Sequence, residues 1–493
     1  MAKRQASTES ATRATTAKAR RRASEASAEP IVERVPRKRD ARPKARQTDF
    51  VVIGAGSGGV AAARRAASHG ARVILVERDA IGGTCVNRGC VPKKMLSYGA
   101  GWASILSTCL SHTGGKEDWR DAIVRVNAEV ARLNTSYKQR LNESGVEIWN
   151  GAAEFNERGD IVVGNEVVHA GKVLVATGAS PIDLTVPGGE LVSSSDDLFT
   201  WQTVPGSIIV IGGGYIAVEM ASILSRYGVK VDLLVREDRL LPKFDHDIAA
   251  ALAEALTAKG IRIHFRAAVT MVSQSNGAFE VCYTQGDNPG RTQTVRAQAA
   301  LAAIGRKPNV SGLGLEALGV QLDDKGGITV DRQFRSSVRS IHAIGDCMAN
   351  NVHLTPVAVA QGRWLADRLF GKRGDMVDFE FVPTAVFCEP AIGAVGLTEA
   401  QAIEAAGGKA DRVRTEIKRF VSLENRFGGV PTPSVFKLVY NARSGRVLGV
   451  HLMDGAAPEI VQTLALALRL GVKASHLKTT MPLHPTVAEE LFG

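Results

Sequence analysis

The chain has 493 residues, of which 45% are hydrophobic and 50 are glycine, and it carries a formal net charge of +11. This length suits two to four compact domains rather than one. We find no apolar run of about 18 residues and no short apolar segment at the N-terminus, so we expect neither a membrane span nor a secretory signal and place the protein in the cytoplasm; six cysteines in so long a chain do not make a disulfide framework.

The positive charge is concentrated in the first 46 residues. This segment holds 14 Lys and Arg against 5 Asp and Glu, a net charge of +9, and its only bulky apolar residues after Met1 are Ile31, Val32 and Val35. Such a composition buries too little apolar surface to fold, so we expect residues 1–46 to form a disordered basic tail. An organelle transit sequence and a polyanion-binding arm are the alternatives for this tail. We do not expect the rest of the chain to bind nucleic acid.

The first glycine-rich segment, TDFVVIGAGSGGVAAARRAASHGARVILVERD, begins at Thr48 and predicts a strand, a tight turn, a helix and a second strand. In its GxGxxG pattern Gly54 makes the turn, Gly56 lets the backbone approach a pyrophosphate, and Gly59 allows the helix to pack on the strand. Glu77, at the end of the second strand, is placed for a ribose hydroxyl. Because a carboxylate disfavours a ribose 2′-phosphate, this unit suits FAD.

Two cysteines follow in GGTCVNRGCVPKK, where Cys85 and Cys90 are separated by four residues. Pro92 is a favoured first residue of a helix, so Cys90 lies near a helix N-terminus, and that terminus together with Lys93 and Lys94 lowers a thiol pKa. A zinc site needs a second ligand pair nearby, which the sequence lacks, so we expect no metal. A static crosslink of so short a loop restricts the unfolded chain little. The pattern therefore favours a redox-active disulfide.

A second glycine-rich segment, GSIIVIGGGYIAVEMASILSRYGVKVDLLVRED, places Gly212, Gly214 and Ala217 at the fingerprint positions. Two such units in one chain predict two bound dinucleotides. The second strand of this unit ends at Val235 and Arg236. A cation at this position favours the 2′-phosphate of NADP over the free ribose of NAD, so we expect NADPH as the second cofactor.

Two apolar strands, KVLVATGAS (172–180) and SIHAIGDC (340–347), follow the fingerprints in chain order. Each ends in small residues and a turn, as strands do beside a dinucleotide. Asp346, at the C-terminal end of the second strand, is placed to accept a hydrogen bond from the ribityl chain of a flavin.

From about residue 48 to its end, the chain resembles the glutathione reductase family within the class I pyridine nucleotide-disulfide oxidoreductases. The resemblance rests on the motifs GGTCVNRGCVPKK, GGGYIAVE, AIGRKPN, IGDC followed by LTPVAVAQGR, VGLTE and HPTVAEELF. It implies an α/β fold with two Rossmann-like dinucleotide-binding domains, for FAD and NADPH, and a C-terminal α+β interface domain. It also implies a homodimer with shared active sites. The implied regions are the tail 1–46, a first FAD-binding part 47–181, an NADPH-binding domain 182–306, a central FAD-binding part 307–379 and an interface domain 380–493.

The resemblance also implies roles in the chemistry. Cys90 is the flavin-proximal thiol, and Cys85 is the thiol that attacks the disulfide substrate. His484, oriented by Glu489, is the acid that reaches in from the partner subunit. The expected ion pair beside the flavin is Lys93 with Glu219, and the ring that covers the nicotinamide pocket is Tyr215. The expected FAD contacts are Gly54, Gly56, Ser57, Gly58, Gly59, Glu77, Gly83, Thr84, Lys93, Thr177, Gly178, Asp346 and Thr355. The expected NADPH contacts are Gly212, Gly214, Tyr215, Ile216, Glu219, Arg236 and Arg306.

Glutathione disulfide carries several carboxylates, which arginines bind well. The positions at which the resemblance expects substrate contacts are Ser57, Arg64, Tyr137 and Arg363. Trypanothione reductases carry an acid and a bulky aromatic in the region of Ala61 and Arg64, so these two residues favour the anionic substrate. A related reductase for a trypanothione-like disulfide or dihydrolipoamide is the alternative.

The chain departs from the family pattern at three places. Pro242 stands where the NADPH-dependent members commonly have a second arginine, and Glu237 adds a negative charge beside Arg236. Both changes weaken the expected preference for NADPH over NADH. The segment 419–436, near the expected substrate site, does not closely match the family and leaves the identity of the disulfide open.

Overall fold

The computed structural model describes residues 45–110, 116–286, 290–371, 378–427, 429 and 432–492, with the side chains of 103–110 and 116–117 left aside. The predicted tail therefore lies outside the described residues up to residue 44. Arg46, which the prediction assigned to the tail, instead begins the first strand. Its guanidinium makes a bidentate ion pair with Glu147, at 2.7 and 2.8 Å, and this pair ties it to a neighbouring strand.

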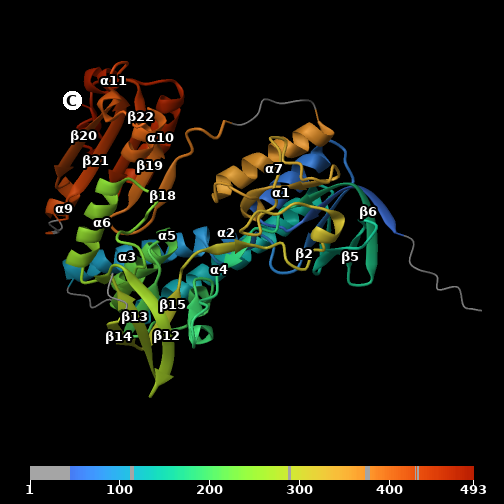
Figure 1. Ribbon diagram of the computed structural model, residues 1–493, viewed down its shortest axis with the longest axis horizontal. Coiled ribbons are helices and arrows are strands. Elements are labelled where there is room, and N and C mark those ends of the chain that lie inside the picture. Colours follow the sequence, from blue (N-terminus) through green and yellow to red (C-terminus); the bar gives the residue numbers. More distant parts are fainter. Residues whose placement is uncertain are drawn as a thin grey trace, which may run out of the picture. The chain divides into compact units, whose positions relative to one another are not determined.

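The first dinucleotide unit is built on a sheet whose central strands run parallel. The strand order is β3-β2-β1-β6-β5-β4, and β17 also pairs with β6. The strands are β1 (Arg46–Ile53), β2 (Val73–Glu77), β3 (Glu147–Asn150), β4 (Ala153–Phe155), β5 (Ile161–Val163), β6 (Glu166–Val175) and β17 (Ile341–Ala343). Strand β17 comes from the central region of the chain, which therefore returns to the sheet of the first unit (Figure 1).

Two helices from distant parts of the chain, α1 (Ser57–Ser68) and α7 (Thr355–Phe370), pack against each other in this unit. Small residues permit the close approach, since a Cβ added at Gly362 would lie 2.5 Å from the carbonyl oxygen of Gly58. Three further helices follow β2 along the chain: α2 (Gly83–Asn87), α3 (Cys90–Leu110) and α4 (Lys116–Glu143).

The second unit contains a parallel sheet with the order β11-β10-β9-β15-β8 and an antiparallel sheet with the order β12-β13-β14. The parallel strands are β8 (Ser193–Ser194), β9 (Ser207–Ile211), β10 (Lys230–Leu234), β11 (Arg262–His264) and β15 (Ala299–Ala302), and the antiparallel ones are β12 (Ala267–Ser275), β13 (Ala278–Gln285) and β14 (Thr292–Ala297). The helices of this unit are α5 (Tyr215–Arg226) and α6 (His246–Ala258). The chain enters and leaves it through the paired strands β7 (Ala179–Pro181) and β16 (Arg306–Pro308).

The C-terminal region is a separate antiparallel sheet with the order β18-β19-β22-β21-β20. Its strands are β18 (Thr384–Val386), β19 (Ile392–Gly396), β20 (Val413–Phe420), β21 (Ser434–Asn441) and β22 (Val447–Met453), and its helices are α8 (Glu399–Ala405), α9 (Leu423–Phe427), α10 (Ala457–Arg469) and α11 (Ala474–Thr479). Helix α10 packs on β18, β19 and β22 (Figure 1). Two Rossmann-like units and an α+β domain confirm the predicted fold class.

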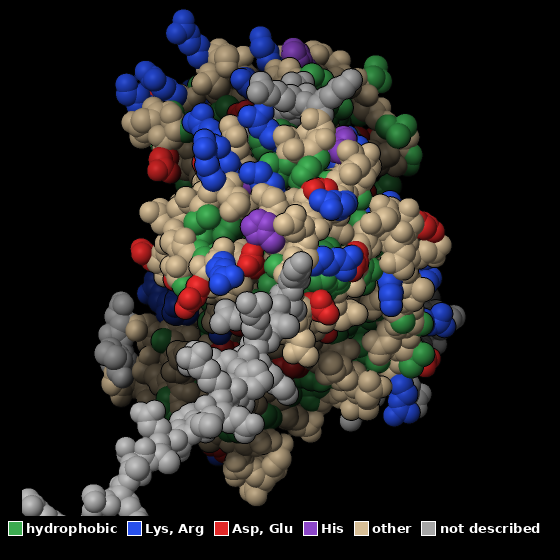
Figure 2. All heavy atoms as spheres, turned by 90° about the vertical axis from the view of Figure 1, so that its right-hand side faces the viewer, with side chains coloured by type: hydrophobic (Ala, Val, Ile, Leu, Met, Phe, Trp, Pro, Cys, Tyr) green, Lys and Arg blue, Asp and Glu red, His purple; other side chains and the backbone are tan. Residues whose placement is uncertain are grey.

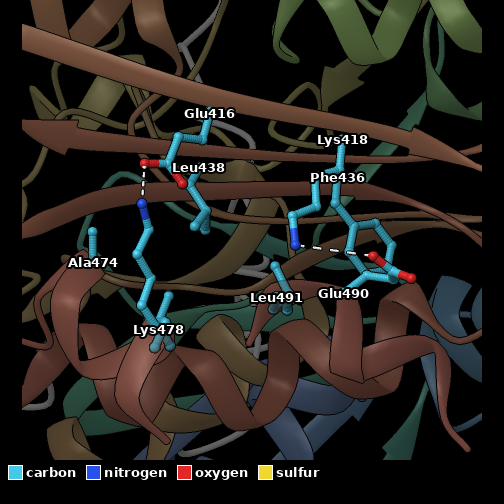
Figure 3. A pocket seen from close by; sticks show the side chains of 9 residues that line it. Glu416, Lys418, Phe436, Leu438, Ala474, Lys478, Glu490 and Leu491 are labelled. Carbon is cyan, nitrogen blue, oxygen red and sulfur yellow. Dashed lines mark hydrogen bonds and ion pairs between the residues drawn. The ribbon is translucent and has the colours of Figure 1, made fainter. Parts of the chain in front are cut away.

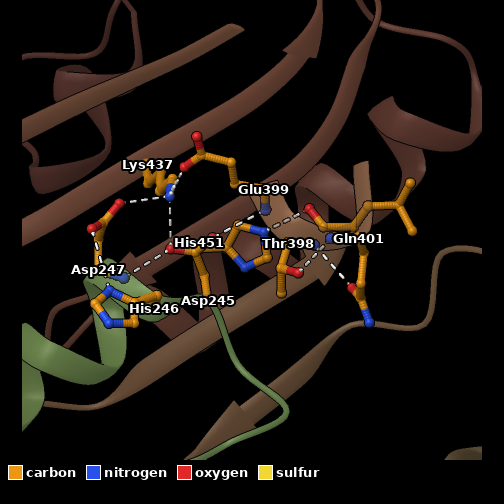
Figure 4. Close-up of polar contacts among 9 residues, drawn as sticks. Asp245, His246, Asp247, Thr398, Glu399, Gln401, Lys437 and His451 are labelled. Carbon is orange, nitrogen blue, oxygen red and sulfur yellow. Dashed lines mark hydrogen bonds and ion pairs between the residues drawn. The ribbon is translucent and has the colours of Figure 1, made fainter. Parts of the chain in front are cut away.

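A buried lysine joins the second unit to the C-terminal sheet. Lys437, on β21, is 1% exposed, and its Nζ lies 2.9 Å from Asp245, 2.6 Å from Asp247 and 2.7 Å from Glu399. Asp245 is the N-cap of α6, and its side chain accepts from the backbone N–H of Asp247. Figure 4 shows the ammonium group among the three carboxylates, with His451 beside them. Glu399 is the last residue of the VGLTE motif, whereas Lys437, Asp245 and Asp247 lie outside the quoted motifs.

On the face drawn in Figure 2, Lys and Arg side chains are interspersed with Asp and Glu. None of the helices in the described ranges has the length and apolar character that crossing a bilayer requires.

Candidate functional site

The candidate site is a cleft of about 740 Å³ to which all three regions contribute. The first unit contributes both glycine-rich backbone and the cysteines, the second contributes the start of α5, and the C-terminal region contributes residues around β18. Among its lining residues are Gly54, Gly56, Ser57, Gly58, Glu77, Gly83, Thr84, Cys85, Cys90, Lys93, Thr177, Gly178, Tyr215, Ile216, Glu219, Arg306, Asp346, Thr355 and Phe387. Most predicted residues for the first cofactor therefore meet in one cavity.

The first glycine turn has the geometry of a pyrophosphate site. Gly54 has φ +103°, and a Cβ there would lie 2.5 Å from the carbonyl oxygen of Ala176. A Cβ at Gly59 would lie 2.0 Å from the oxygen of Gly54, so the crossing of helix and strand requires glycine. Gly56, the N-cap of α1, would place a Cβ 4.0 Å from the nearest atom, so the approach to the helix N-terminus is open.

Glu77 stands at the end of β2 as predicted. Its carboxylate accepts hydrogen bonds from the backbone N–H groups of Ala55, at 2.6 Å, and Asp79, at 2.9 Å. Burial raises the pKa of this carboxyl, and backbone hydrogen bonds from Ala55 and Arg78 oppose the rise. Asp346, in the 3₁₀ turn after β17, also lines the cleft, and burial raises its pKa as well.

The two cysteines are free thiols in contact with each other, which is the reduced state of the predicted pair. Helix α3 begins at Cys90, so the expected helix N-terminus is present. The hydrogen bond from Cys85, the hydroxyl of Thr355 and the charge of Lys93 lower the pKa of Cys90 to about 6 against the opposing effect of burial. The hydrogen bond to Cys90 and burial raise the pKa of Cys85. The pair therefore holds one proton and one negative charge near neutral pH.

A buried ion pair connects three regions beside the thiols. Lys93 Nζ, on α3, donates to Glu219 Oε1, on α5, at 2.7 Å, and the two side chains are 11% and 3% exposed. The same carboxylate oxygen accepts from the backbone N–H of Phe387 at 2.8 Å. The ring of Phe387 also lies beneath the ammonium of Lys93, 4.3 Å from ring centre to nitrogen. The predicted pair of Lys93 with Glu219 is present in the structure, and a backbone group from the C-terminal region completes it.

The second glycine turn repeats the geometry of the first. Gly212 has φ +135°, and a Cβ there would lie 2.3 Å from the oxygen of Ala303. A Cβ at Gly214 would meet no atom within 4 Å, so the N-terminus of α5 is open to a phosphate. Tyr215 begins α5 with its side chain 44% exposed, and it lines the cleft beside Ile216.

The two arginines predicted for the second cofactor differ in setting. Arg306 is 10% exposed and donates to Asp196 at 3.2 Å, to the oxygen of Ala179 at 2.6 Å and to the Thr84 hydroxyl at 3.4 Å. Its guanidinium thus joins the strands where the two units meet. Arg236 lies two residues beyond β10 with its side chain 82% exposed, and it is not among the residues that line the cleft.

Of the four predicted substrate contacts, Ser57 alone lines the cleft, and its hydroxyl is a hydrogen-bond partner of Cys85. Arg64 donates to the Ser144 hydroxyl at 3.1 Å on the outer side of α1. Tyr137, on α4, is partly buried and packs against the hydrophobic core of the first dinucleotide unit. Arg363 is exposed on α7. Within one chain these three residues lie outside the cleft lining.

The predicted acid is also outside the cleft of its own chain. His484 Nδ1 lies 2.8 Å from Glu489 Oε2, and the histidine side chain is 79% exposed. The segment that carries it is fixed to the C-terminal sheet (Figure 3). Lys478 pairs with Glu416 at 2.8 Å, and Leu491 is buried against the same sheet. The histidine is therefore presented on an anchored segment at the surface.

Several cleft residues were missed by the sequence analysis. Phe387 and Glu459 come from the C-terminal region, where neither lies in one of the quoted motifs, and Asp196 is recognisable only through its contact with Arg306. His353 precedes the LTPVAVAQGR motif directly, and its position beside that motif was the signal available for it.

Comparison with known proteins gives consistent matches over the chain. A family model described as pyridine nucleotide-disulphide oxidoreductase matches residues 48–362, and the dimerisation domain of the same family matches residues 382–492. A glutathione reductase from Burkholderia cepacia is 38% identical over 446 residues, which are 90% of this chain and 97% of that protein. A glutathione reductase from Nostoc sp. is 36% identical over 456 residues, which are 90% of this chain and 98% of that protein.

Proposed function

The chain belongs to the pyridine nucleotide-disulphide oxidoreductases, and we propose that it is a glutathione-disulfide reductase that uses NADPH and FAD. The observation that carries the proposal is the pair of Cys85 with Cys90, whose pKa lies near 6, in a cleft lined by both dinucleotide units. The relatives named glutathione reductase, similar over nine tenths of the chain, support the same substrate.

The residues present fit both cofactors. The open approach to Gly56 and the carboxylate of Glu77 suit the pyrophosphate and free ribose of FAD, with Thr84, Thr177, Gly178, Asp346 and Thr355 along the cleft. The open approach to Gly214 suits the pyrophosphate of the nicotinamide nucleotide. When bound, the two cofactors supply hydride and electron transfer to the cysteine pair.

The thiols perform the exchange with the substrate. Cys85 gives its proton to His484 of the partner subunit and attacks one sulfur of glutathione disulfide as a thiolate, so that a mixed disulfide forms and one glutathione leaves. Cys90, whose low pKa keeps it as thiolate, then attacks the Cys85 sulfur, which forms the Cys85–Cys90 bond and releases the second glutathione. Lys93 stabilises the thiolate by its charge, and Glu219 fixes the position of Lys93.

A leaving thiolate needs a proton, and we assign this step to His484 of the partner subunit, whose orientation Glu489 maintains. In a homodimer with shared sites, Ser57, Arg64, Tyr137 and Arg363 hold the carboxylates and amide groups of the substrate. Exposed leucines support such a dimer: Leu466 on α10 is 63% exposed, Leu470, the C-cap of this helix, is 79% exposed, and Leu483, beside His484, is 74% exposed.

We further propose the regions 47–181, 182–306, 307–379 and 380–493 as FAD-binding, NADPH-binding, central and interface parts. The ladder between β7 and β16, which pairs Pro181 with Arg306, supports the two inner boundaries. The predicted basic tail lies outside the described residues up to residue 44, and both its role and the cytoplasmic location stay predictions.

Initial rates with glutathione disulfide, trypanothione disulfide and lipoamide, each with NADPH and NADH, test the proposal. We expect the holoenzyme to be yellow and glutathione disulfide to be the best substrate. A better rate with lipoamide or trypanothione disulfide would contradict the assignment of Arg64 and Arg363. A colourless protein that takes up no flavin would contradict the family chemistry itself.

Cysteine variants test the division of labour between the thiols. On reduction with NADPH we expect a long-wavelength absorption from a thiolate beside the flavin. Cys90→Ser should abolish this band, whereas Cys85→Ser should keep the band and stop turnover. The opposite pattern would exchange the two roles.

A further inference from the structure

The residues after β10 form an ion pair at the position where a dinucleotide site meets the adenosine ribose. Arg236 Nε and Nη2 donate to the same oxygen of Glu237, at 3.0 and 2.8 Å. The arginine side chain is 82% exposed and the glutamate side chain 49% exposed. The cation expected to recognise a 2′-phosphate therefore already has a carboxylate of its own chain as partner.

The backbone beneath this pair is fixed, so the two side chains are held at the ribose position. Glu237 O accepts from the N–H of Arg266 at 2.9 Å, and Val235 N–H donates to His264 O at 2.9 Å. Further along the same loop, Leu241 N–H donates to the oxygen of Gly213, in the phosphate-binding turn, at 2.8 Å. The ion pair and the glycine turn thus belong to one connected segment.

An ion pair between exposed side chains contributes little free energy, so a ligand can separate it. A ribose 2′-phosphate offers Arg236 a stronger, charge-assisted partner, but it then brings its negative charge next to Glu237. A ribose without the phosphate leaves Glu237 free to accept from the 2′-hydroxyl, as acidic residues do in NAD sites. Each nucleotide therefore gains one favourable partner at this position.

We propose that Glu237 is a specificity-determining residue: it competes with the nucleotide for Arg236, and through this competition the second site accepts both NADPH and NADH. The inference rests on the proposed function, because it requires that the second glycine turn binds a nicotinamide nucleotide. It goes beyond that function by assigning the cofactor range to one acidic side chain.

Equilibrium binding to the FAD-loaded enzyme tests the proposal without turnover. The probes are adenosine 2′,5′-bisphosphate and adenosine 5′-monophosphate, measured by isothermal titration calorimetry at low salt. For Glu237→Gln we expect tighter binding of the bisphosphate by about threefold to fivefold, the scale of one exposed charge interaction, and weaker binding of the monophosphate. Arg236→Gln should weaken the bisphosphate selectively. The matched control is Glu280→Gln, which removes the acid of another ion pair in the same unit; Glu280 is 28% exposed and pairs with Arg296, 71% exposed, at 2.7 Å.

The ratio of the two affinities decides the outcome. The proposal is supported if the affinity for the bisphosphate relative to the monophosphate rises in Glu237→Gln and stays unchanged in Glu280→Gln. The difference between these two variants should shrink at about 0.5 M salt, because salt screens exposed charges. Equal ratios in Glu237→Gln, the control and the unaltered enzyme would overturn it while leaving the proposed function intact. Failure of the yellow enzyme to bind either nucleotide would overturn the proposed function together with this inference.

Discussion

Replacement of Lys437 by methionine should destabilise the protein strongly, although the residue is remote from the cysteines. The change removes the cation that three carboxylates share and leaves Asp245, 2% exposed, as an unpaired buried charge. Asp247 and Glu399 are 36% and 40% exposed and can turn toward water. Breaking a buried pair costs about 3–5 kcal/mol, and because only one of the three carboxylates stays buried, we expect the lower end, about 3 kcal/mol of unfolding free energy.

Neighbouring groups do not replace the lost charge. His451 is 2% exposed, and burial lowers its pKa, so its imidazole is neutral. Its Nε2 is occupied by the oxygen of Leu397 at 2.9 Å, and its Nδ1 has no hydrogen-bond partner among the described residues. His246 lies 3.8 Å from Asp247, so among the described residues it is the buried Asp245 that depends on Lys437 for a positively charged partner.

Urea denaturation of the holoenzyme measures this loss, with Lys478→Met as the matched control. Lys478 forms an exposed pair with Glu416 in the same sheet, so its replacement should leave the unfolding midpoint nearly unchanged. Acid provides a second readout. Burial opposes the shift, but the hydrogen bond from Lys437 lowers the pKa of Asp245. In the unaltered protein this carboxylate therefore contributes its full stabilisation above its unfolded pKa and loses it as the pH falls through the lower folded pKa. Without Lys437 burial raises that pKa, so the gap between variant and unaltered protein should narrow from pH 7 to pH 4. Equal losses for Lys437→Met and Lys478→Met would refute the reasoning.

Three further outcomes follow from the site. Because the pKa of Cys90 is lowered to about 6, the long-wavelength band of the reduced enzyme should disappear as the pH falls through about 6. Cys85→Ala removes the hydrogen bond that contributes most to this shift, so it should move the midpoint of the titration upward. A midpoint near the ordinary cysteine value of about 8.5 in the unaltered enzyme would contradict the assignment. His484→Gln should lower kcat by about 10²- to 10⁴-fold in steady-state assays and leave the long-wavelength band in place. Glu489→Gln should lower kcat less, since the imidazole remains. Loss of the band in either variant would indicate a structural role for that residue. Leu470→Glu should halve the molecular mass measured by light scattering and remove activity. The control is Met271→Glu, at a residue of β12 that is 44% exposed, and it should change neither the mass nor the activity. A monomer that keeps its activity would exclude an active site shared between subunits.

The sequence was sufficient for features that depend on local backbone geometry. Gly54 and Gly212 could be identified because a left-handed conformation and a close carbonyl require glycine at both. Pro92, taken as the first helical residue, placed the helix N-terminus near Cys90, and α3 begins at Cys90, two residues earlier. In these cases the backbone conformation is determined by residues within or next to the motif, so the sequence motif predicts it directly.

Other features depend on contacts between residues far apart in the chain. Phe387 completes the carboxylate site of Glu219 through a backbone N–H, a group that every residue except proline carries. The partners of Arg306, among them Asp196, become visible only when β7 and β16 pair. A single sequence contains no local pattern for such contacts. For this reason the sequence did not reveal the residues that the C-terminal region contributes to the cleft.

The loop from Arg236 to Asp245 connects the cofactor site to the C-terminal sheet. At one end the Arg236–Glu237 pair faces the ribose position, and at the other Asp245 is bound by Lys437. Between them, Leu241 is hydrogen-bonded to Gly213 of the phosphate-binding turn. The segment is thus held at three points, so the bonds of Glu237 to Arg266 and of Leu241 to Gly213 oppose any shift that the loss of Lys437 causes at Asp245. The Lys437 cluster joins the second unit to the dimerisation domain, and none of its residues lines the cleft.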